Sequence, residues 1–177
     1  MKAVVCTKLG EPKLLEIKEI DKPTINKDEV LIKVEVAGVN FPDALLVQGK
    51  YQIVIDPPFI PGNEVCGIIE EKGENVDIPV GTKVIGIPPI GGFAEFVTIN
   101  KNLVIPVNMN FDSLAGASLP INYGTSYYAL KRRANAQSGE SLLVLGASGG
   151  IGTATIQLAK VMGPVSYTHL RAHETQR

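Results

Sequence analysis

The chain has 177 residues, of which 45% are hydrophobic and 20% are charged, and its formal net charge is −1. This composition is typical of a globular protein and excludes a disordered chain. The near-neutral charge without a basic run argues against a nucleic-acid partner, and no run of about eighteen apolar residues predicts a membrane span.

The first hundred residues consist of short β-rich runs separated by turns, which predicts a compact β-barrel or sandwich. Between the runs, "DPPFIPGNE" and "GIPPIGG" are predicted loops, because proline removes a hydrogen-bond donor from a strand. Binding residues often lie on such loops. The strands are expected within residues 2–8, 14–20, 28–39, 65–73, 82–87, 93–99 and 103–107.

Around residue 111 the period of the pattern changes from strand to helix. Residues 111–120 predict a short helix that is capped by Asp112 and stopped before Pro120. Residues 125–134 predict a second helix that ends in basic residues. An all-β domain therefore gives way to an α/β domain near residues 108–124.

The segment "ESLLVLGASGGIGTATIQLAKVMG" predicts a strand, a glycine turn and a helix that ends at Gly163. Leu142–Leu145 is expected to be a parallel strand covered on both faces. In the G-x-G-x-x-G spacing of dinucleotide sites, Ala147 takes the first position and Gly149 and Gly152 the others. The spacing alone also fits a tight structural turn. The flanking strand and helix favour a phosphate site at the start of the helix.

The order of motifs along residues 1–163 resembles the medium-chain dehydrogenase/reductase superfamily, and more narrowly its zinc-free NADPH:quinone oxidoreductase branch. The resemblance implies a mixed fold, with a GroES-like β-barrel domain over residues 1–120. The first part of a truncated Rossmann doubly wound domain is expected over residues 121–163. Family members have their active site in the cleft between these domains and commonly form homodimers or homotetramers. The motifs are "AGVNFPDALLVQGKY", "PPFIPGNEVCGIIE", "GTKVIG", "GGFAEFVTI", "SLPINYGTSYYAL" and "GESLLVLGASGGIGTATIQLAK".

The same resemblance indicates that no zinc is bound. Asn40, Asn63 and a position near Ile121 stand where zinc alcohol dehydrogenases have their metal ligands. Asparagine and isoleucine are not the thiolate and imidazole ligands that a catalytic zinc requires. Both histidines, His169 and His173, lie in the C-terminal tail, so the rest of the chain has no imidazole.

Without a Lewis acid, oxidation of an alcohol is disfavoured, whereas reduction of an electrophilic acceptor mainly needs orientation. The predicted function is metal-free transfer of a hydride from NADPH to a small-molecule quinone. One alternative is reduction of an activated C=C bond in a 2-alkenal, enone or enoyl thioester. A second is a non-catalytic NADPH-binding sensor or structural protein. NADPH is preferred over NADH from the resemblance alone, so NADH stays open.

The resemblance also implies the site residues. Asn40 and Tyr51 border the nicotinamide and acceptor pocket and are the predicted catalytic residues, and Asn40 and Thr125 contact the cofactor. Structural alternatives are that Asn40 caps a turn, Tyr51 is a half-buried loop aromatic and Thr125 caps its helix. The residues expected to hold the pyrophosphate are Gly149, Gly150, Ile151 and Gly152.

Several further residues are given structural roles from the sequence. Glu64 is expected to form structural hydrogen bonds rather than to act as a general acid, and Asp43 to cap a short helix. Cys66 is interpreted as a small buried hydrophobic residue. The aromatic residues expected to pack, rather than to stack against an acceptor, are Tyr123, Tyr127 and Tyr128.

Residues 164–177 are expected to be a non-native tail. The string from Val165 to Thr175 equals the translation of DNA that resembles a transposase-type sequencing adapter, and it lacks strand or helix periodicity. The 177-residue chain itself is therefore expected to be aggregation-prone and inactive, and the function is assigned to the parent enzyme. The two cysteines form no disulfide framework and no secretory signal is present, which predicts a cytoplasmic protein.

Overall fold

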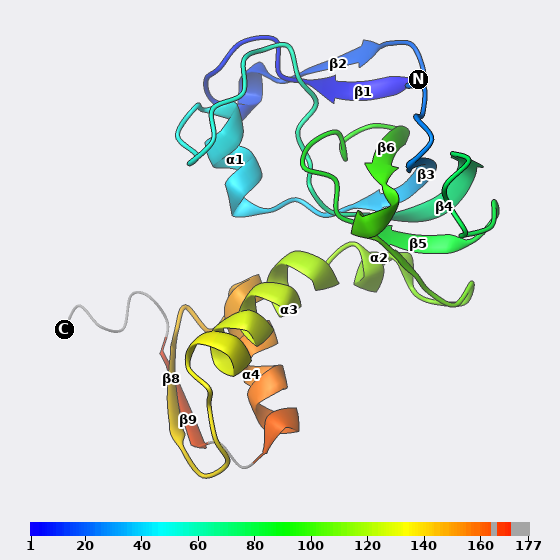
Figure 1. Ribbon diagram of the computed structural model, residues 1–177. Coiled ribbons are helices and arrows are strands. Elements are labelled where there is room, and N and C mark those ends of the chain that lie inside the picture. The colour runs from blue at the N-terminus through cyan, green and yellow to red at the C-terminus, as the bar shows by residue number, and fades with distance from the viewer. Residues whose placement is uncertain (164–165, 171–177) are drawn as a thin grey trace. The chain divides into compact units, whose positions relative to one another are not determined.

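The computed structural model describes residues 1–163 and the backbone of residues 166–170 (Figure 1). The other tail residues, 164–165 and 171–177, lie outside the described residues, and so does most of the predicted non-native segment. The chain divides into two compact units, Met1–Ser118 and a second that begins at Leu119.

All seven strands expected in the first unit are present. Five of them form an antiparallel sheet in the order β6-β3-β4-β5-β7, and β1 and β2 form a separate antiparallel pair (Figure 1). The strands are β1 (Lys2–Val5), β2 (Glu16–Glu19), β3 (Glu29–Ala37), β4 (Val65–Lys72), β5 (Lys83–Gly86), β6 (Phe96–Asn100) and β7 (Val104–Pro106). Short helices in this unit are η1 (Pro12–Leu14), α1 (Phe41–Val47), η2 (Lys101–Leu103) and α2 (Ser113–Gly116).

The two sheets do not close into one continuous hydrogen-bonded barrel within the described ranges. Isolated bridges connect Ala3 with Ala94 and Cys6 with Phe59. The proline-rich loops of residues 56–61 and 87–92 adjoin these bridges, and proline cannot donate to a ladder. The β-rich domain is therefore as expected, and it consists of two antiparallel sheets with isolated bridges between β1 or its end and the following loops.

Two apolar clusters fill the first unit. The larger one lies on the five-stranded sheet, and its members from β3 and from β6 are two residues apart, as side chains on one face of a strand are. Its members are Val30, Ile32, Val65, Ile69, Val76, Val84, Val97, Ile99 and Val104. The smaller cluster consists of Cys6, Leu46, Val47 and Phe59, and it anchors α1 against the proline-rich loop.

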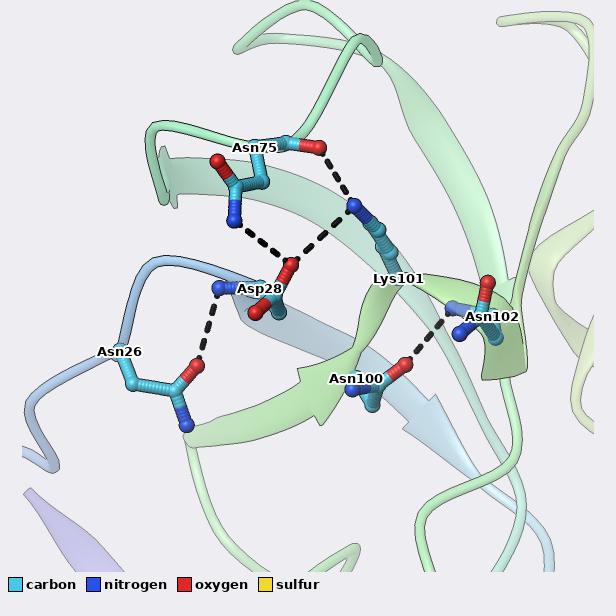
Figure 2. A network of polar contacts seen from close by, with 6 residues as sticks. All are labelled: Asn26, Asp28, Asn75, Asn100, Lys101 and Asn102. Atoms are coloured by element: carbon cyan, nitrogen blue, oxygen red, sulfur yellow. Dashed lines mark hydrogen bonds and ion pairs between the residues drawn. The ribbon is translucent and has the colours of Figure 1, made fainter.

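A network of polar contacts holds together the loops at one end of the five-stranded sheet (Figure 2). Asp28 Oδ1 accepts a hydrogen bond from Asn75 Nδ2 at 2.9 Å and pairs with Lys101 Nζ at 3.2 Å. Lys101 Nζ also donates to the Asn75 carbonyl at 2.7 Å. The hydrogen bonds from Asn75 and then Lys101 lower the pKa of the Asp28 carboxyl. Three segments distant in sequence thus share one carboxylate.

The second unit contains α3 (Leu119–Tyr127), a π-helical turn (Tyr128–Arg133), β8 (Ser141–Leu145), α4 (Gly150–Met162) and β9 (Ser166–Leu170). The short helix capped by Asp112 is confirmed, because α2 ends at Gly116, before Pro120. The α3 helix begins at Leu119, six residues before the predicted start, so the predicted start at residue 125 is wrong. Pro120 occupies the first turn of α3, where its missing N–H is not needed. The end of α4 before Gly163 is confirmed, and Gly163 has a φ of +133°.

Two expectations about the strands of this unit are corrected. In β8 only Val144 is buried, whereas Leu143 and Leu145 are 60% and 66% exposed. Helix α4 contacts β8, and the residues that the structure describes leave Leu143 and Leu145 uncovered. After Val165 no strand was expected, but Ser166–Leu170 forms β9, parallel with β8. A free strand edge presents backbone donors and acceptors, which pair with little regard to side chains.

No helix in the described ranges has the length and hydropathy that a membrane span requires.

Candidate functional site

The start of α1 is held by a carboxylate. Asn40 is the N-cap residue, and its backbone N–H donates to Asp43 Oδ2 at 2.8 Å. Asp43 Oδ1 accepts a second hydrogen bond, from the N–H of Gly62 at 3.2 Å. The predicted capping role of Asp43 is confirmed, and the same side chain also attaches the "PGNE" loop to α1.

Glu64 orients the side chain of Asn40. The carboxylate of Glu64 is buried, and its Oε2 accepts a hydrogen bond from Asn40 Nδ2 at 2.9 Å. The backbone N–H of Gly38 donates to the Glu64 carbonyl at 2.9 Å. The predicted structural role of Glu64 is confirmed. The cap position that was the structural alternative for Asn40 is also present, and its catalytic role stays a prediction.

Asp43 is expected to titrate above the usual carboxyl range. Burial raises its pKa, and the N–H donors of Asn40 and Gly62 oppose part of the shift. A raised pKa in the folded state means that the stability contributed by Asp43 is full below about pH 4 and is lost as pH rises through the raised value. Carbon-13 NMR of the Asp43 carboxyl should give a midpoint above about 4. A midpoint at or below the usual value would contradict this expectation.

A pocket of about 230 Å³ lies between α1 and the proline-rich loops. Its wall is mainly apolar, and its polar residues are Asp43, Tyr51 and Asn63. Tyr51 is half-buried and packs against the smaller apolar cluster, whereas Asn40 adjoins the pocket through Asp43 and is not part of its wall. The lining residues are Pro42, Asp43, Leu46, Tyr51, Ile53, Ile55, Asn63, Pro89 and Ile90.

The glycine turn connects β8 to α4 as the sequence predicts. Gly146 has a φ of +69°, and its carbonyl accepts the N–H of Gly149 at 3.0 Å. A Cβ atom on Gly152 would lie 2.5 Å from the Gly146 carbonyl oxygen and 2.7 Å from Ala147 Cα. The turn therefore depends on glycine for the close approach of helix and strand.

The first turn of α4 can receive an anion. Gly150, Ile151 and Gly152 contribute N–H groups that have no acceptor within the helix. Gly149, Gly150 and Ile151 are exposed, so the approach to the first of these groups is open, whereas Gly152 is buried. The positive end of the helix dipole adds to the attraction of a phosphate. The geometry fits a pyrophosphate on the residues that the sequence singled out.

Helix α3 supports this turn through residues that the motif did not identify. Ser126 Oγ donates to the Ile151 carbonyl at 3.1 Å and accepts from Thr155 Oγ1 at 2.9 Å. A Cβ atom on Gly150 would lie 2.5 Å from Asn122 Oδ1. Thr125 is exposed inside α3, so its alternative role as a helix cap is wrong, and its contact with the cofactor stays a prediction. The sequence signal that could have identified Asn122 and Ser126 is their four-residue spacing, which places both side chains on the same face of a helix.

The remaining candidates are settled by burial. Cys66 is fully buried and burial raises the pKa of its thiol, which confirms its interpretation as a small hydrophobic residue. Tyr123 donates its hydroxyl to Gln157. Tyr127 and Tyr128 are 48% and 56% exposed, so the predicted packing is wrong for these two side chains.

Two other observations bear on where a ligand can bind. A larger cavity of about 400 Å³ is lined by Leu130, Leu142 and Met162, toward the end of α4 that is far from the glycine turn. It therefore does not belong to the phosphate site. The described residues contain no group of three or more His, Cys, Asp or Glu side chains that could hold a metal ion.

Comparison with known proteins identifies relatives for both units. Residues 26–109 match the family described as "Alcohol dehydrogenase GroES-like domain". The chain is 39% identical to Bos taurus quinone oxidoreductase-like protein 2 over 161 residues, which are 89% of this chain and 45% of that protein. It is 37% identical to Rattus norvegicus quinone oxidoreductase, covering 92% of this chain and 50% of that one. The chain therefore spans about half the length of the curated relatives it matches.

Solved structures give the same result for the fold. A probable oxidoreductase from Mycobacterium abscessus superposes with a TM-score of 0.88 at 38% identity, covering 97% of this chain and 54% of that one. The quinone oxidoreductase from Thermus thermophilus, whose structures include a complex with NADPH, gives a TM-score of 0.82 at 37% identity. This second match covers 97% of this chain and 52% of the other.

Proposed function

We propose that the whole protein transfers a hydride from NADPH to a quinone without a metal. The premise is that this chain belongs to the medium-chain dehydrogenase/reductase superfamily and to its quinone oxidoreductase-like branch. The observation that carries the proposal is the exposed glycine turn at the start of α4. The similar protein from Thermus thermophilus was determined with NADPH, which supports the choice of cofactor.

The glycine turn would hold the pyrophosphate of the cofactor. The N–H groups of Gly150, Ile151 and Gly152 would donate to its oxygens, and Gly149 would leave room for the close approach. Ser126 holds the Ile151 carbonyl and so fixes the direction of the first turn of α4. When bound, NADPH would supply the hydride, and the protein's contribution is orientation.

The pocket of the first unit would receive the acceptor. Its wall is mainly apolar, which favours the stacking of a ring. Tyr51 provides a hydroxyl in that wall, and Asn40 has its carboxamide fixed by the buried carboxylate of Glu64. Carboxamides are neutral and bind metals weakly. They therefore support a reaction without a metal, in which the acceptor is electrophilic by itself.

The test uses the full-length protein, in which residues 1–163 are followed by the remaining length that the relatives have. NADPH and a panel of acceptors are supplied to it. NADPH oxidation by 1,4-benzoquinone or 1,4-naphthoquinone is the expected result, followed at 340 nm, with NADH as the cofactor control. Oxidation only with a 2-alkenal, an enone or an enoyl thioester would replace the quinone by an activated alkene. NADPH binding without turnover of any acceptor would favour a sensor and overturn the proposal.

A further inference from the structure

The side chain of Asn63 has hydrogen-bonding capacity that the protein does not use. Its Oδ1 atom is buried and accepts no hydrogen bond from any residue that the structure describes. Most buried polar atoms have a partner, since leaving one unsatisfied costs stability. An apolar residue of similar size would avoid that cost at a purely structural position.

The backbone on both sides of Asn63 is firmly held. The N–H of Gly62 donates to Asp43 Oδ1, and the Gly62 carbonyl accepts the N–H of Gly92 at 2.9 Å. Glu64, on the other side, is buried and bonded to Asn40. The position of the Asn63 carboxamide is thus set by its neighbours and not by hydrogen bonds of its own.

The carboxamide lines the pocket of the first unit, whose other walls are mainly apolar. Of the two polar atoms of the carboxamide, Oδ1 alone is buried without a partner, so Nδ2 is the atom that a molecule in the pocket can reach. Nδ2 is a donor of two hydrogen bonds, and it suits a carbonyl oxygen. The pocket encloses about 230 Å³, below the roughly 300–1,000 Å³ of drug-sized sites, which suits a ligand of one or two rings.

We infer that Asn63 is the residue that positions the carbonyl oxygen of a one- or two-ring ligand in this pocket, through a hydrogen bond from Nδ2. The inference rests on the proposed function for the identity of that ligand, a quinone or an enone. It adds to that function the residue that recognises the oxygen. Because a lone donor in an apolar wall penalises ligands without an acceptor, Asn63 would also determine specificity.

A matched pair of unreactive ligands tests this inference without the cofactor. 1-Indanone and indane have the same ring system and differ in one carbonyl oxygen. The dissociation constant of each is measured by titration of the full-length protein used for the acceptor panel, without NADPH, and is followed in nitrogen-15 NMR spectra. The wild type is expected to bind 1-indanone roughly tenfold more tightly than indane. The Asn63→Leu variant should bind both equally, with indane at least as tight as in the wild type.

The control is Asn110→Leu, which changes an exposed asparagine outside the pocket and should keep the tenfold preference. If Asn63→Leu does not fold, the wild-type spectrum decides, because the side-chain NH₂ signal of Asn63 should move with 1-indanone and stay in place with indane. A preference that survives in Asn63→Leu, or an Asn63 signal that ignores both ligands, overturns the inference. Neither result depends on NADPH turnover, so a failure of the proposed function would be seen separately, in the acceptor panel.

Discussion

Replacing Gly152 with alanine is expected to abolish NADPH binding to the full-length protein, with a loss of at least about a hundredfold in affinity. The new Cβ atom would meet the Gly146 carbonyl oxygen and Ala147 Cα, at 2.5 and 2.7 Å. These are backbone atoms, so the start of α4 must move away from β8. Its free N–H groups would then point away from the pyrophosphate. Fluorescence titration with NADPH measures the loss.

The matched control for this variant is Gly124→Ala. Gly124 is also a helical glycine of the second unit, but a Cβ atom there would meet nothing within 4 Å. Alanine in place of a helical glycine stabilises by about 0.5–1 kcal/mol, so this variant should bind NADPH as before and unfold at a slightly higher temperature. Normal NADPH affinity in Gly152→Ala would mean that the turn does not hold the cofactor.

The second large effect is expected at Gly38, in the first unit. A Cβ atom at this position would lie 2.6 Å from Glu64 Oε2 and even closer to the Ala117 carbonyl oxygen. Gly38→Ala should therefore lower the free energy of unfolding by about 2–3 kcal/mol, because the core cannot accept the extra atom without strain. The displaced carboxylate would also release Asn40 Nδ2, whose NMR signal should shift. Chemical denaturation measures the stability change.

Gly124→Ala again serves as the reference, since it adds the same methyl group without a clash. An unchanged midpoint of denaturation in Gly38→Ala, together with an unshifted Asn40 signal, would show that the packing around Glu64 is looser than the structure has it. A shift of the Asn40 signal without a loss of stability would show that the carboxylate moves freely.

The strands were predictable from sequence because each is a short β-rich run between clear turn signals. The start of α3 was not, since Pro120 gives the same local signal at a helix start as after a helix end. Whether Leu143 and Leu145 are buried or exposed depends on which elements cover β8, and no local sequence pattern contains that information. The same holds for β9, which forms by pairing with an edge.

For the candidate site, the glycine turn was predictable because its spacing follows from backbone geometry. Asn63 was not identified as a pocket residue, because an unsatisfied buried atom is visible only in three dimensions. Ser126 was hidden beside Thr125, and the choice between them depends on which face of α3 meets α4. Local chemistry is thus readable from sequence, while the partners of a side chain depend on packing.

The two hydrogen bonds of Asp43 have a consequence for local unfolding. One carboxylate accepts from the start of α1 and from the loop at Gly62, so fraying of the helix removes an acceptor from the loop. The helix and the loop therefore open together as one cooperative segment, rather than as two independent ones. The part of the pocket wall formed by Pro42, Asp43, Leu46 and Asn63 belongs to that segment, so this part of the wall is kept or lost together.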